Sequence, residues 1–75
     1  MSGNELEIIR NNIKYYRKEK KFTQERLSEV SGISKDYLSE IERGKKAPSL
    51  KRLIIIANAL NIELYKLCYA DNNLN

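Results

Sequence analysis

Apolar residues recur at helical spacing in several short segments of the chain, and the period-two alternation of a β-strand is absent. Five helices are predicted, at about residues 5–20, 24–31, 35–43, 50–60 and 63–69. The first carries an apolar stripe formed by Leu6, Ile9, Ile13 and Tyr16 (or Arg17). The fourth carries one formed by Leu50, Leu53, Ile54, Ala57 and Leu60. The pattern predicts an all-α, five-helix bundle over residues 5–69, with flexible polar ends at residues 1–4 and 70–75.

Polar residues mark the helix boundaries. Thr23, Ser34 and Ser49 stand immediately before predicted helices, where a hydroxyl can accept a hydrogen bond from the first turn. Gly44 and Asn61 follow predicted helices, and these two residue types are common where a helix ends in the left-handed backbone conformation. The connections between helices are therefore short.

The chain has 75 residues, enough for one small domain, and a formal net charge of +4. The positive charges are clustered, because residues 43–52 contain five cations and no acid. A second cluster lies between Lys14 and Lys21, where Glu19 is the lone acid. A basic surface of this kind attracts nucleic acid or an anionic membrane, although it can also be an ordinary solvated face.

The residue inventory disfavours catalysis and metal binding. Histidine is absent, and no glycine-rich phosphate loop is present. We therefore expect no enzyme activity, cofactor, metal or small-molecule ligand. The single cysteine, Cys68, excludes an internal disulfide and suits the reducing cytoplasm, where we expect the protein to act. No apolar run reaches the length of a membrane span.

Residues 23–44 predict two short helices joined by a turn at Gly32. Leu27, Ile33, Leu38 and Ile41 are the apolar residues that would lock the two helices together. Gly32 can adopt the positive φ that a sharp turn between helices requires. Helices this short are marginal alone, so the pair gains its stability from packing.

The outer face of the second helix in this pair is predicted to be polar. It carries Lys35, Asp36, Tyr37, Ser39, Glu40 and Arg43. A braced helix with a polar outer face can enter the major groove of DNA, which is about 12 Å wide. The alternative is a helical hairpin with an ordinary hydrated surface.

The same segments resemble the helix-turn-helix family of phage repressors and Cro, also called the xenobiotic-response-element family. The resemblance rests on these motifs, in this order: Thr23-Gln24-Glu25, Leu27, Ser31-Gly32-Ile33-Ser34, Tyr37-Leu38-Ser39, Ile41-Glu42-Arg43-Gly44, Pro48-Ser49-Leu50, Ile56-Ala57, Ala59-Leu60-Asn61-Ile62 and Leu64. It covers roughly residues 9–68. Lys21 departs from the family pattern, in which glycine commonly ends the first helix.

The resemblance implies a role for each matched residue. Expected base contacts are Lys35, Asp36, Ser39 and Glu40. Expected contacts to the DNA backbone are Thr23, Gln24, Tyr37, Arg43, Lys45 and Lys46. Arg17 and Glu42 would form a partly buried ion pair that orients the recognition helix. Asp36 and Glu40 also place two acids on a face that approaches a polyanion.

The resemblance implies a sequence-specific regulator of transcription that binds double-stranded DNA. We expect a homodimer on palindromic operators, with Ile55, Tyr65 and Tyr69 in the dimer interface. Ile62, Leu64 and Leu67 are expected in the core, as are Cys68 and Tyr16, with Tyr15 on the surface. Prophage repressors, restriction–modification controllers and antitoxins all fit. The alternative is an antitoxin-like protein-interaction module that uses the same bundle without specific DNA binding.

Overall fold

The computed structural model describes residues 4–70, and the side chains from residue 5 onward. Every regular element in this range is a helix, which confirms the predicted all-α fold. The helices are α1 (Asn4–Glu19), α2 (Gln24–Ser31), α3 (Lys35–Glu42), α4 (Leu50–Leu60) and α5 (Tyr65–Cys68). The flexible ends predicted at residues 1–4 and 70–75 lie almost wholly outside the described residues.

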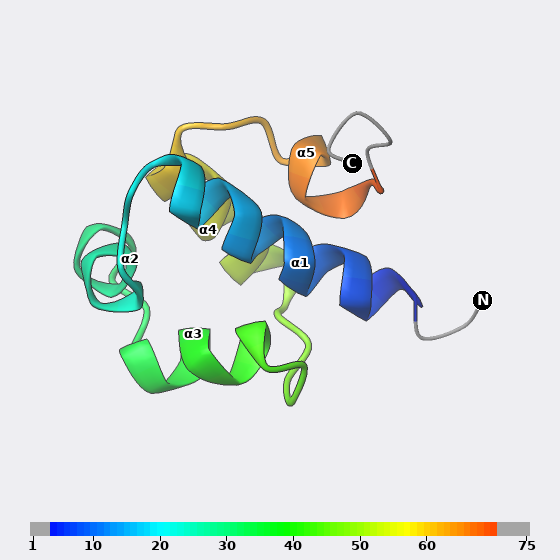
Figure 1. Cartoon of the computed structure of the whole chain (residues 1–75), viewed down its shortest axis with the longest axis horizontal. Coiled ribbons are helices and arrows are strands. Elements are labelled where there is room, and N and C mark those ends of the chain that lie inside the picture. Colours follow the sequence, from blue (N-terminus) through cyan, green and yellow to red (C-terminus); the bar gives the residue numbers. More distant parts are fainter. Residues whose placement is uncertain (1–3, 71–75) are drawn as a thin grey trace.

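Helix α1 runs through the middle of the molecule, and the shorter helices pack around it (Figure 1). It contacts α3, α4 and α5, while α2 contacts α3 and α4. The core that results is formed by Ile13, Leu27, Ile33, Leu38, Ile41, Leu53, Ile56, Ala57, Leu60 and Leu67. Each of the five helices therefore places at least one apolar residue in the common core, and the short α5 contributes Leu67.

The end of α1 is formed by a lysine in the left-handed conformation. Lys21 has φ +61°, and its amide donates to the carbonyl of Lys18 at 2.9 Å. The next amide, of Phe22, donates to the carbonyl of Arg17 at 3.0 Å. These bonds satisfy carbonyls that the helix end would otherwise leave open, but a residue with a Cβ is strained at positive φ.

Replacing Lys21 with glycine should therefore stabilise the fold. Glycine adopts this φ without the steric penalty of about 1–2 kcal/mol that an L side chain carries there, although it also loses more entropy on folding. We expect a net gain of about 1 kcal/mol in the free energy of unfolding, measured by chemical denaturation. Lys20→Gly is the matched control, since Lys20 is equally exposed but lacks the positive φ; it should not stabilise.

Side-chain caps define the starts of the next three helices, as predicted. The hydroxyls of Thr23, Ser34 and Ser49 accept hydrogen bonds from the amides of Arg26, Tyr37 and Arg52 at 2.9, 3.1 and 3.2 Å. The predicted bounds of α2 and α4 agree with the structure. Helix α3 ends one residue before the prediction, with Arg43 as its cap, and α5 is a single turn rather than seven residues.

The predicted apolar stripe of α4 was partly wrong. The buried residues are Leu53, Ile56, Ala57 and Leu60, whereas Leu50 and Ile54 are 64% and 41% exposed. The buried set follows the helical spacing i, i+3, i+4, i+7. Leu50 and Ile54 lie outside this stripe. Three consecutive isoleucines at 54–56 make it difficult to predict which of them faces the core. Leu6, at the start of the predicted stripe of α1, is also exposed.

A buried polar residue for which no role was predicted holds the C-terminal helix. Asn12 of α1 is 4% exposed, and its Nδ2 donates to the carbonyls of Leu67 and Tyr69 at 3.1 and 2.8 Å. Leu67 consequently points inward. The prediction that Cys68 is buried was wrong: the next residue on a helix points about 100° away, and Cys68 is exposed.

Candidate nucleic-acid interface

The turn between α2 and α3 has the conformation that the sequence predicted. Gly32 has φ +76°, and its amide donates to the carbonyl of Ser28 at 2.9 Å. Leu27 of α2 and Leu38 of α3 are fully buried in the common core. Helix α3 lies along one edge of the molecule, and no other described element covers its outer side in this view (Figure 1).

An ion pair fixes α3 to α1. Nε of Arg17 lies 2.7 Å from Oε2 of Glu42, and Nη2 lies 3.0 Å from Oε1, so the contact is bidentate. Nη1 of the same guanidinium donates to the carbonyl of Phe22 at 2.7 Å. Arg17 and Glu42 are only 8% and 6% exposed. The pair expected from the family resemblance is therefore present, and it joins α1 to the end of α3.

Glu42 also joins two residues whose role in this network the sequence did not indicate. Nε2 of Gln24, at the start of α2, donates to Oε1 of Glu42 at 3.1 Å. Nη1 of Arg10 donates to the backbone carbonyl of Glu42 at 3.2 Å. Glu42 thus ties α1, α2 and α3 together. One N–H of the Gln24 amide is engaged inside the protein, which leaves the other for the phosphate contact predicted for this residue.

The four residues predicted to contact bases lie on successive turns of α3. Lys35 and Asp36 are exposed in the first turn, and Ser39 and Glu40 are half-buried in the second. The face therefore presents one cation, two acids and one hydroxyl. These groups can donate to guanine O6 and N7 or accept from cytosine N4.

One of the two acids on this face already has a cationic partner. Nζ of Lys46 lies 3.7 Å from Oε1 of Glu40. The amides of Lys45 and Lys46 also donate to the Glu40 carbonyl, at 2.8 and 3.3 Å. The loop after α3 is thereby folded back onto the helix. The ammonium of Lys46 partly offsets the negative charge of Glu40 on the outer face of α3.

The ring of Tyr37, on α3, lies next to two cations, one from the loop after α3 and one from α4. Nζ of Lys46 lies 5.7 Å from the centroid of its ring, and the guanidinium carbon of Arg52 lies 4.9 Å away. Both distances are in the range of a cation–π interaction. From the sequence, Arg52 was identified only as a member of the basic segment at residues 43–52, and no contact was predicted for it.

The remaining residues predicted to contact the DNA backbone surround α3. Thr23 is exposed at the start of α2, where its hydroxyl is engaged as the cap. Arg43 is exposed, with Nε donating to the Ser39 carbonyl at 3.3 Å. Lys45 is exposed in the loop that follows. The structure thus brings the predicted base and backbone contacts together around one helix.

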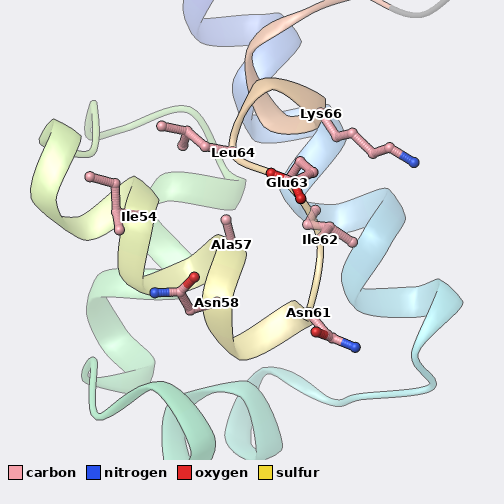
Figure 2. A pocket seen from close by; sticks show the side chains of 8 residues that line it. All are labelled: Ile54, Ala57, Asn58, Asn61, Ile62, Glu63, Leu64 and Lys66. Carbon is pink, nitrogen blue, oxygen red and sulfur yellow. The ribbon is translucent and has the colours of Figure 1, made fainter.

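A separate hollow lies where α4 meets the connection to α5 (Figure 2). Apolar side chains from both segments line it, namely Ile54, Ala57, Ile62 and Leu64, together with the polar Asn58, Asn61, Glu63 and Lys66. Of the predicted interface residues, Ile55 is half-buried beside the turn at Gly32, while Tyr65 and Tyr69 are exposed on and after α5. The two tyrosine rings meet edge to face, with centroids 5.8 Å apart. Within residues 4–70, no helix is long and apolar enough to cross a membrane.

Known proteins resemble this chain in sequence and in structure. It is 39% identical over 61 residues to the control protein C.SmaI of Serratia marcescens, covering 81% of this chain and 73% of that protein. It is 46% identical over 52 residues to the immunity repressor of Bacillus phage phi105, covering 69% of this chain and 36% of the repressor. The restriction–modification controller protein C.AhdI of Aeromonas hydrophila superposes with a TM-score of 0.81 at 31% identity, over 85% of this chain and 97% of that one.

The family assignment follows from a match that spans the whole site. Residues 13–67 match the helix-turn-helix family HTH_3, and this range contains Arg17, the turn at Gly32 and all of α3. The resemblance inferred from the motifs of residues 23–64 is thereby confirmed. The chain belongs to the HTH_3 helix-turn-helix family.

Proposed function

We propose that this protein is a transcriptional regulator that binds double-stranded DNA in the cytoplasm, as a homodimer on palindromic operators. Helix α3 lies in the major groove, with Lys35, Asp36, Ser39 and Glu40 toward the bases. Thr23, Gln24, Tyr37, Arg43, Lys45 and Lys46 contact the sugar–phosphate backbone. The observation that carries the proposal is the polar outer face of α3, on which Lys35, Asp36 and Arg43 are exposed, on a helix joined to α1 by the buried Arg17–Glu42 pair.

Charge and family membership support DNA as the partner. The net charge is +4, and the cations of residues 43–52 follow directly after α3. Phosphate neutralisation by lysine and arginine supplies much of the affinity of DNA-binding proteins. The similar proteins named above are a control protein, an immunity repressor and a restriction–modification controller, and others similar to this chain are transcriptional regulators. No enzyme is among them.

A dimer is favoured by the small size of a single recognition helix and by exposed apolar surface. One module buries too little area for tight specific binding, whereas a two-fold dimer reaches two successive major grooves. Tyr65 and Tyr69 offer exposed aromatic area, and Ile54, which lines the hollow in Figure 2, is 41% exposed. Ile55 is half-buried, so we assign it a smaller share of the interface than Tyr65. Sedimentation equilibrium should give twice the 8.8 kDa mass of the chain.

The alternative function, a protein-interaction module, makes a different prediction about salt. Three of the proposed backbone contacts, Arg43, Lys45 and Lys46, are cations, so a dimer would neutralise about six phosphates. Affinity for duplex DNA should then fall by about 10³-fold between 50 and 200 mM salt. Fluorescence anisotropy with a labelled duplex measures this directly. An interaction module without DNA binding would show no saturable binding at the lower salt concentration, and that result would overturn the proposal.

A further inference from the structure

We propose that Arg52 of α4 is an additional contact to the DNA backbone, and that the ring of Tyr37 positions it. The inference rests on the proposed function and extends it, because Arg52 is outside the set of residues predicted to touch DNA. It links α4 to the DNA surface that the recognition helix occupies. Tyr37 then acts as a positioning residue in addition to any contact of its own.

The geometry places the guanidinium against the recognition helix. Its central carbon lies 4.9 Å from the centroid of the Tyr37 ring. Tyr37 and Arg52 also line one depression, together with Ser34 at the start of α3 and the turn at Gly32. Arg52 is therefore on the side of α4 that faces the first turn of α3, where the DNA-reading residues begin.

The guanidinium of Arg52 contacts the Tyr37 ring, but no carboxylate of the described residues pairs with it. Arg52 is also exposed. Lys46, the other cation over the same ring, differs because it is 3.7 Å from Glu40. Arg52 thus keeps its full charge available for an external anion.

Stacking on a ring suits an arginine that must bind a phosphate. The aromatic ring interacts with the flat guanidinium face, so the N–H groups at its edge remain free to donate. Those groups match the oxygens of a phosphate in a bidentate arrangement. Stacking also restricts a long side chain before binding, which reduces the entropy lost when the contact forms.

The test is a salt titration of operator affinity for wild type, Arg52→Ala, Tyr37→Leu and the double variant. Each phosphate contact contributes about 0.9 to the slope of log K against log salt, so Arg52→Ala should lower the slope of a dimer by about 1.8. Arg52→Ala should raise the dissociation constant in both backgrounds. Per subunit, the fold increase should be about two to five times smaller in the Tyr37→Leu background than in wild type. Tyr37→Phe, which keeps the ring, should retain this coupling.

Lys51→Ala is the matched control, because Lys51 is an exposed cation one residue away for which no cation–π interaction with the ring is found. Its effect should be the same with Tyr37 and with leucine at that position. A wild-type slope in Arg52→Ala, or additive effects of Arg52→Ala and Tyr37→Leu, would overturn the inference. If wild type itself failed to bind any duplex, the proposed function would fail instead. Thermal melting confirms that each variant remains folded.

Discussion

Replacing Arg17 with alanine should lower the free energy of unfolding by about 3–5 kcal/mol. The change removes three hydrogen bonds, two to Glu42 and one to the carbonyl of Phe22. Glu42 is 6% exposed, so its carboxylate would be left buried with only the Gln24 amide as a side-chain partner. A small domain has a total stability of about 5–15 kcal/mol, so much of it would be lost.

Chemical denaturation of the free protein measures this loss. Lys18→Ala is the control, since Lys18 is the next residue on the same helix turn and is exposed; it should change stability by less than about 0.5 kcal/mol. Arg17→Ala could instead leave stability unchanged and abolish DNA binding. Arg17 would then be a phosphate contact, and the ion pair would not be what orients α3.

Replacing Lys35 with alanine should relax the base preference at one position of the operator half-site. A lysine that donates to guanine O6 and N7 discriminates against a wrong base by about 1–3 kcal/mol, which is roughly five- to 150-fold in affinity. Lys35 is exposed in the first turn of α3, so the substitution should leave the fold intact. Binding competition between the operator and duplexes with single base changes measures the preference at each position.

Lys45→Ala provides the comparison. Lys45 follows α3 in the loop, and we propose that it contacts phosphate, which carries no sequence information. Its loss should weaken binding to all duplexes about equally and reduce the salt slope by about 0.9 for each subunit. If Lys35→Ala behaved in the same way as Lys45→Ala, Lys35 would be a backbone contact and the assigned orientation of α3 would be wrong.

Local signals in the sequence were sufficient to predict the helices near the site. Hydroxyl residues at Thr23, Ser34 and Ser49 and a glycine at position 32 each act within a few residues of the boundary they define. The apolar residues that join α2 and α3 are likewise close in sequence. For the same reason, the polar outer face of α3 could be predicted before the structure was known.

The features that were missed depend on packing between distant segments. Asn12 reaches carbonyls 55 and 57 residues further along the chain, and Arg10 reaches one 32 residues away. Which of the three isoleucines at 54–56 is buried depends on how α4 packs against the other helices. The contact of Arg52 with Tyr37 depends on where the first turn of α4 lies relative to α3. None of these follows from a local pattern, because each depends on tertiary geometry.

We propose that α2 and the Arg17–Glu42 pair hold α3 so that its outer face reads the major groove. Selection of bound duplexes from a pool of random DNA sequences provides the test. We predict enrichment of a palindrome whose half-sites are centred about 10 base pairs apart, as two recognition helices on one face of the DNA require. Recovery of a pool with no enriched sequence would contradict the claim.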